Sequence, residues 1–145
     1  MSPDAGYEVH WPVVCGRLNV YGATGPPSAS TARQALEDMC NIWRWVLEHK
    51  LNLTRTDCHQ YSTVLVVPDT FSAWEVKEVM NILLRHLEFF SCVVHQESMA
   101  AVFAGGSSLA CVVNIGAHST TVCCVDDGKY LRTTIYMNYY SFKYL

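Results

Sequence analysis

The spacing of hydrophobic residues alternates along the chain between the period of a helix and that of a strand. Seven apolar residues within residues 32–50 recur at helical intervals, and either Ser30 or Thr31 is the expected N-cap. A second helix is predicted after Ser72, because Glu75 stands three residues later and completes a capping box. Its expected buried face consists of Val76, Val79, Met80, Leu83, Leu84 and Leu87.

Shorter elements follow in the second half of the chain. A short helix is predicted for residues 96–103 and ends at Gly105 and Gly106. Its expected inward residues are Met99, Ala100, Val102 and Phe103. Strands are predicted for residues 63–67, 90–94, 110–113, 120–125 and 130–136, and a hairpin for residues 7–20. This order predicts an α/β domain with a mixed sheet and flanking helices.

The first of these strands has no polar face. Residues 63–67 read TVLVV, which is typical of a strand covered on both sides of a sheet. The chain as a whole is also poor in charge: of its 145 residues 50% are hydrophobic and only 16% charged, with a net charge of −3. A disordered tail and a DNA binder that works by positive charge alone are therefore excluded.

The sequence indicates a soluble, intracellular chain, since it contains no apolar run long enough to span a bilayer and no visible signal peptide. Its seven cysteines have no C-x-x-C spacing, which argues against zinc or a redox motif. We interpret them as small hydrophobic residues buried in a reducing compartment. Cys123 and Cys124 are neighbours on a predicted strand and should point to opposite faces.

Two segments carry candidate chemistry. Residues 114–119 form a turn with a glycine and small polar groups, and such a turn can direct backbone N–H groups at a phosphate or be a simple turn. Gln96 and Glu97 follow a predicted strand, where ligands of open sheets bind, although they equally suit the start of a helix. His95 and His118 have no identifiable partner. No catalytic triad, carboxylate pair or metal cluster can be recognised, so the residues alone define no activity.

Six segments of the chain resemble one known family. They are residues 9–12, 16–20, 41–45, 93–103, 110–116 and 121–128, which read VHWP, GRLNV, NIWRW, VVHQESMAAVF, ACVVNIG and TVCCVDDG. With the order of predicted elements, they resemble the actin family, most closely its actin-related protein 8 subfamily and the plant counterpart, actin-related protein 9. The resemblance runs from about residue 7 to about residue 131.

The resemblance implies part of the actin-like, ribonuclease-H-like ATPase fold, mainly its first subdomain. Two lobes of that fold close over ATP, and the second of two phosphate loops falls on residues 114–119. Its implied cofactor-binding residues, in vestigial form, are Asn114, Gly116, Ala117, His118 and Ser119. Gln96 matches the residue that orients the attacking water. Actins carry Asp where this chain has Asn114 and Ala117, so we expect no bound metal.

The resemblance does not include a first phosphate loop or a second lobe. We therefore expect a truncated form, with a partial actin-like domain in residues 1–131 and a divergent C-terminal tail in residues 132–145. A single lobe cannot form the cleft that encloses ATP, so we expect no enzyme activity and no cofactor. ATP would be bound only if another chain or segment supplied the second lobe. The uncovered strands, 63–67 and 110–113, should then expose apolar patches.

Members of this subfamily are non-motor subunits of the INO-type nucleosome-remodelling complex. The resemblance thus implies a nuclear, non-catalytic component that works in chromatin remodelling, transcription regulation and DNA repair. Its implied partners are actin, other actin-related or remodeller subunits, and histones. The net charge of −3 argues against direct DNA contact by this segment. Two alternatives stay open: a nucleotide-binding actin-like ATPase, and a non-functional truncated product.

Overall fold

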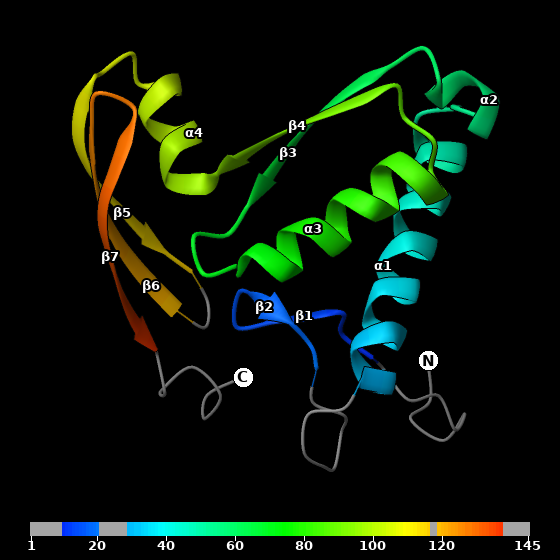
Figure 1. The fold of residues 1–145 in the computed structure, drawn as a ribbon, viewed down its shortest axis with the longest axis horizontal. Coiled ribbons are helices and arrows are strands. Elements are labelled where there is room, and N and C mark those ends of the chain that lie inside the picture. Colours follow the sequence, from blue (N-terminus) through cyan, green and yellow to red (C-terminus); the bar gives the residue numbers. More distant parts are fainter. Residues whose placement is uncertain (1–9, 21–28, 117–118, 138–145) are drawn as a thin grey trace.

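The computed structural model describes residues 10–20, 29–116 and 119–137 and places them in an α/β fold (Figure 1). The helical elements are α1 (Ala29–Lys50), α2 (Arg55–Cys58), α3 (Ala73–Asn81), its continuation η1 (Ile82–His86) and α4 (Glu97–Ala104). The strands are β1 (Val13–Val14), β2 (Arg17–Leu18), β3 (Ser62–Val67), β4 (Ser91–Gln96), β5 (Leu109–Ile115), β6 (Ser119–Asp126) and β7 (Lys129–Met137). None of the described helices combines the length and apolar character needed to cross a membrane.

The strands are divided among three sheets. β1 and β2 form a short antiparallel hairpin, β3 and β4 a parallel pair, and β5, β6 and β7 an antiparallel sheet. The predicted α/β class is confirmed. Parallel and antiparallel pairing both occur, as predicted for a mixed sheet, but they occur in separate sheets. β7 continues to Met137 beside β6, so the strand pairing runs past residue 131; the division of the chain at that residue stays a prediction.

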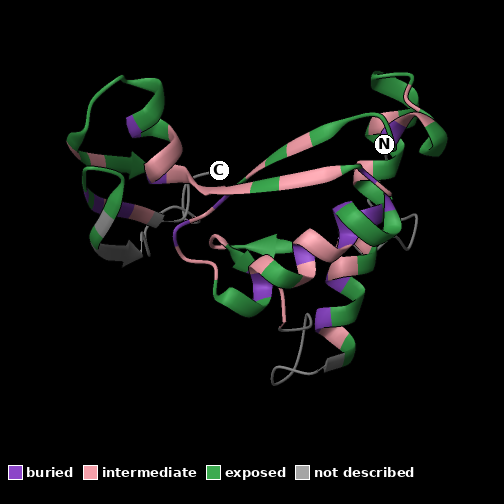
Figure 2. Cartoon of the chain, turned by 45° about the horizontal axis from the view of Figure 1, so that its top comes forward, coloured by how far each residue is buried: buried purple, intermediate pink, exposed green. Residues whose placement is uncertain are grey.

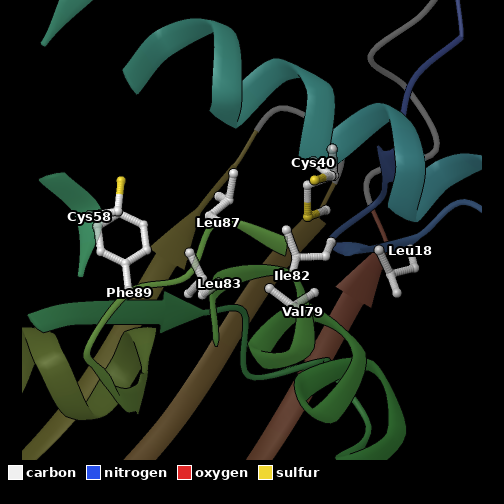
Figure 3. Packing of buried hydrophobic residues seen from close by; sticks show 9 residues of the cluster. Leu18, Cys40, Cys58, Val79, Ile82, Leu83, Leu87 and Phe89 are labelled. Atoms are coloured by element: carbon white, nitrogen blue, oxygen red, sulfur yellow. The ribbon is translucent and has the colours of Figure 1, made fainter. Parts of the chain in front are cut away.

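The main hydrophobic core lies between α1, α3, η1 and the β3–β4 pair. Leu18, Cys40, Cys58, Val79, Ile82, Leu83, Leu87 and Phe89 converge there, as Figure 3 shows. The helix widens to a π-helix at η1, which places both Ile82 and Leu83 in the core and leaves Leu84 exposed. The inward position predicted for Leu84 is therefore wrong, because the prediction assumed an unbroken α-helical period.

A second, smaller core lies under α4. Val102 packs on Cys123 and Val125 of β6, with Met99, Ala110 and Val112 at its edge. Figure 1 shows α4 between the β3–β4 pair and the three-stranded sheet, where it connects the two parts of the chain. Phe103 is exposed, contrary to the prediction, because α4 has a sheet against only one side.

The β3–β4 pair is open on one face, which corrects the prediction for residues 63–67. Val64 and Val66 are 68% and 50% exposed, whereas Leu65 packs against the main core and Val67 is buried (Figure 2). Among the described residues no layer covers the outer side of this sheet, so the apolar side chains on that side of β3 are exposed. The expectation that strands 63–67 and 110–113 expose apolar patches is confirmed, since Val113 is also 55% exposed.

Two smaller predictions also need correction. α1 begins at Ala29, so Ser30 and Thr31 lie inside its first turn instead of capping it. The cysteines are not uniformly buried: Cys40, Cys58 and Cys123 are, but Cys111 and Cys124 are exposed. Cys123 and Cys124 do point to opposite faces, as predicted. The capping box of Ser72 and Glu75 is confirmed, and so is the helix end at Gly105 and Gly106, the latter with a φ of +64°.

Candidate functional site

The candidate site begins at the carboxyl ends of the parallel strands β3 and β4. Val67 and Gln96, the last residues of the two strands, are register partners. Parallel pairing brings the segments that follow the two strands to the same edge of the sheet, where open α/β sheets bind ligands. Asp69 and the first turn of α4 therefore lie together there.

Asp69 anchors the start of α4. Its Oδ1 accepts a hydrogen bond from the backbone N–H of Ser98 at 3.4 Å, and its Oδ2 accepts one from the Ser98 hydroxyl. Both residues are buried. A carboxylate at this position satisfies an unpaired N–H of the first helical turn and suits the positive end of the helix dipole. The contact fixes where α4, and with it Gln96, meets the parallel strands.

Gln96 is the N-cap residue of α4, with φ −72° and ψ 148°, and its side chain makes no capping hydrogen bond. The side chain is half-buried. Glu97 is the first helical residue, where the helix dipole favours a carboxylate. His95 precedes them on β4 and its ring packs edge-on against Phe103, with ring centroids 5.6 Å apart. This aromatic contact gives His95 a structural role.

The turn between β5 and β6 carries the second half of the site. Asn114 lies opposite Thr121 in the antiparallel register, and Asn114 and Gly116 are exposed. Ser119 is the first residue of β6. Ala117 and His118 lie outside the described residues. The predicted bounds of the turn, residues 114–119, are therefore too wide, because Asn114 belongs to β5 and Ser119 to β6. Whether the turn binds phosphate stays a prediction.

The described residues beside the turn share one face of the β5–β6–β7 sheet. Side chains alternate along a strand, so Asn114 on β5 lies on the same face as Ala110 and Val112, which border the core under α4. Thr121 likewise shares the face of Cys123 and Val125 on β6. Asn114 and Thr121 therefore lie on the side of the hairpin that α4 covers.

Thr121 is a site residue that the sequence did not reveal. It is buried, and its hydroxyl oxygen has no hydrogen-bond partner among the residues that the structure describes. A buried hydroxyl without a partner is unfavourable by about 1–3 kcal/mol, so the position suits a water molecule or the oxygen of a bound group. The hydroxyl is buried because α4 packs on this face of the sheet, and no local sequence pattern predicts that packing. Asp69 could have been found, because it directly follows a strand that is parallel to β4.

The donor set fits a phosphate better than a metal ion. Among the described residues beside the turn, Asn114 carries an amide and Thr121 a hydroxyl, and neither side chain is a carboxylate. Among the described residues, no cluster of three or more His, Cys, Asp or Glu side chains could hold a metal. The side chains of Asn114 and Thr121 do not provide the oxygen anions that Mg²⁺ prefers.

Comparisons with known proteins match most of the chain. The sequence profile of the Actin family matches residues 33–145. Actin-related protein 8 of Salmo salar is 40% identical over 128 residues, which cover 88% of this chain and 20% of that protein. Actin-related protein 9 of Arabidopsis thaliana is 42% identical over 134 residues, which cover 92% of this chain and 22% of that protein.

A solved structure also matches the fold. The chain superposes with a TM-score of 0.74 and 36% identity on a structure described as human actin-related protein Arp8 in its ATP-bound state. The match covers 85% of this chain and 24% of that one. The chain thus spans about a fifth of the length of the curated relatives it matches. The partial actin-like fold and the similarity to actin-related proteins 8 and 9 are both confirmed.

Proposed function

The chain belongs to the actin family, and on that premise we propose that it acts through protein contacts, without hydrolysing ATP, in an INO-type nucleosome-remodelling complex. Its similarity to actin-related proteins 8 and 9 supports this assignment, since that subfamily supplies non-motor subunits to such complexes. A role in chromatin remodelling, transcription regulation and DNA repair, and a place in the nucleus, follow from the same proposal.

The observation that carries the proposal is the open face of the β3–β4 pair. Val64 and Val93 are register partners and are 68% and 51% exposed, and Val66 beside them is 50% exposed. Three exposed valines on adjacent strands form a continuous apolar surface, which we call the valine face. Such surfaces mark contacts with other protein surfaces. We assign the valine face to a subunit of the remodeller, with actin and other actin-related subunits as the first candidates and histones as further partners.

Charge favours protein partners over DNA. The net charge is −3, and a DNA-binding surface gains most of its affinity from clustered Lys and Arg side chains that neutralise phosphates. Neutral apolar side chains on the valine face instead suit a protein surface.

Co-purification tests the proposal. The tagged chain would be incubated with nuclear extract, and bound proteins identified by mass spectrometry at several salt concentrations. We expect actin and named remodeller subunits with the wild-type chain, and their loss with a Val64→Thr/Val93→Thr variant, which keeps β-branched side chains but removes apolar surface. Val113→Thr, on another sheet, is the matched control. Absence of these subunits at every salt concentration would refute the proposal.

Nucleotide binding is the second candidate. The superposition on an ATP-bound relative and the unpartnered Thr121 hydroxyl beside the turn favour it. Asn114, Gly116 and Ser119 would hold the phosphates from one side, through the amide, the backbone N–H groups and the hydroxyl. Bound ATP would supply a γ-phosphoryl group for transfer to water, with ADP as the leaving group. Gln96 would orient that water. Asn114 stands where actins carry Asp, however, and the missing carboxylate would have helped to hold the metal ion that accompanies ATP.

Calorimetry separates the two candidates. The interaction proposal expects no heat of ATP binding to the purified chain, or weak binding without hydrolysis. Saturable binding that is lost in a Thr121→Val variant and is followed by ATP hydrolysis would favour the nucleotide enzyme. Thr121→Ser retains the hydroxyl and is the control for changes in packing.

A further inference from the structure

Cys111 and Cys124 lie directly opposite each other on neighbouring strands. They are register partners in the antiparallel β5–β6 pair, and both are exposed and carry free thiols. The face they share is the one turned away from α4, because the alternate residues Val112 and Cys123 pack under that helix. Two thiols thus stand side by side where small molecules reach them.

The spacing of the strands suits a bond between the two sulfurs. Opposed residues of an antiparallel pair have Cα atoms about 4.5–5.5 Å apart, and disulfides form over about 4.4–6.8 Å. The neighbouring Cys111 thiol raises the pKa of Cys124, which is the effect of a hydrogen bond and of charge repulsion between adjacent sulfurs. Cys111 and Cys124 therefore form a vicinal dithiol.

We propose that the Cys111–Cys124 dithiol is a reversible modification site for small-molecule disulfides of the glutathione type. One cysteine loses its proton, and its thiolate attacks a sulfur of the small disulfide; that S–S bond breaks and the released thiolate takes up a proton. The second cysteine then attacks the protein sulfur of the mixed disulfide and displaces the other small thiol. In sum, two protein thiols are oxidised to one disulfide, and one small disulfide is reduced to two thiols.

The bond formed in this way is easily reduced again. Opposed side chains in a sheet have Cβ atoms about 4.5–5.5 Å apart, whereas a disulfide needs about 3.5–4.5 Å. Closing the bond draws β5 and β6 together locally, and strained, exposed disulfides are the labile ones. The segment closed by the bond contains the turn of residues 114–119, so oxidation ties the two strands that carry the candidate site.

The other cysteines do not form such a pair. Cys123 adjoins Cys124 in sequence but is fully buried on the opposite face, and Cys40 and Cys58 are buried in the main core. Cys92 lies on β4 with Thr63 as its register partner, and Cys15 lies in the β1–β2 turn. Within the described residues, the β5–β6 pair is the place where two cysteines meet in register.

Peptide mapping after oxidation tests the proposal. The full chain would be treated with oxidised glutathione, alkylated, digested and analysed by mass spectrometry. Trypsin cannot separate the two cysteines, since no Lys or Arg lies between them, but elastase can cut at the valines and alanine in between. We expect a linked Cys111–Cys124 peptide to replace the two free-thiol peptides, and an excess of reduced glutathione to restore them.

Single substitutions define the pair. In Cys111→Ser and in Cys124→Ser the reaction should stop at the mixed disulfide, with one glutathione on the remaining cysteine of the pair. The control variant Cys92→Ser should form the Cys111–Cys124 disulfide like the wild type. Because both sites are exposed, circular dichroism should be unchanged. The proposal would be overturned if both cysteines kept a glutathione without forming a link, or if neither cysteine reacted. It would also be overturned if Cys124→Ser still formed a disulfide from Cys111, now to Cys123.

Discussion

The side chain of Glu75 fastens the β1–β2 hairpin to the first turn of α3 through Arg17. Its Oε2 accepts a hydrogen bond from Arg17 Nη2 at 3.0 Å, and its Oε1 accepts one from the backbone N–H of Leu18, also at 3.0 Å. Oε2 in addition accepts the backbone N–H of Ser72 at 2.7 Å. Glu75 thus serves both as the helix-cap partner of Ser72 and as the attachment point of a hairpin that is distant in sequence.

Removing this charge should destabilise the fold. Glu75 is 3% exposed, and hydrogen bonds to a charged group contribute about 1.5–3 kcal/mol. We expect Glu75→Gln to lower the free energy of unfolding by about 2 kcal/mol, measured by urea denaturation. Glu78→Gln, on the same helix, is the matched control and should change it by less than about 0.5 kcal/mol. Equal stabilities of the two variants would show that the hairpin is not held by Glu75.

The same residue should make stability depend on pH. Burial alone would raise the pKa of Glu75, but the hydrogen bonds from Arg17, Ser72 and Leu18 outweigh it, and the pKa is lowered from its ordinary value of 4.5. A depressed pKa stabilises the fold above pH 4.5, and that stabilisation is lost as the pH falls through the pKa of the folded state.

Denaturation at several pH values checks this dependence. The difference in unfolding free energy between wild type and Glu75→Gln should be constant above about pH 5.5 and shrink progressively below about pH 4.5. Other carboxylates titrate in the same range, but they cancel in this difference. A difference that stays constant down to pH 3 would contradict a lowered pKa for Glu75.

The contact between Asp69 and Ser98 should be cooperative. Asp69→Asn and Ser98→Ala each remove part of a buried hydrogen-bonded pair, and pairs in direct contact couple by about 0.5–3 kcal/mol. In a double-mutant cycle we expect a coupling of about 1 kcal/mol or more. Thr70→Ala, next to Asp69 but bonded to Gly16, is the control and should be additive with Ser98→Ala. Additivity of the Asp69 and Ser98 substitutions would mean that the contact does not stabilise α4.

The two hydrophobic cores should unfold separately. Among the described residues, the core around Val79 and Leu83 and the core around Cys123 and Val125 share no buried residue. All four tryptophans precede α4 in the sequence, so fluorescence follows the first core, while alkylation of Cys123, measured by mass spectrometry, follows the second. In urea we expect a broad transition with different midpoints for the two probes. A single sharp transition shared by both probes would contradict independent cores.

ATP hydrolysis should be absent from the purified chain. Asn114 stands where actins carry a carboxylate, which removes an oxygen anion that would hold the metal accompanying ATP. Phosphate release should therefore equal the buffer background for wild type and for Gln96→Ala alike. Hydrolysis above background that Gln96→Ala abolishes would assign catalysis to this residue.

Local patterns were sufficient to predict the elements of the fold. The capping box of Ser72 and Glu75 and the glycines after α4 depend on residues close in sequence, and each lies where it was predicted. The candidate turn and Gln96 were found in the same way, through short motifs that resemble the actin family. These signals are local because backbone hydrogen bonds and turn conformations are satisfied within a few residues.

Tertiary packing decided which faces are covered and which distant side chains meet. The spacing of hydrophobic residues does not distinguish the exposed Val64 from a core valine, because a strand covered on both faces and one covered on a single face can have the same sequence. Val64 is exposed because no described element packs on that face of β3 and β4. The pairing of Asp69 with Ser98, the isolation of the Thr121 hydroxyl and the opposition of Cys111 and Cys124 likewise arise from strand register and helix docking. The sequence by itself therefore determined the elements, the family and the position of the candidate turn. The environment of each side chain was decided by contacts between segments far apart in the chain, since burial is a property of the assembled layers.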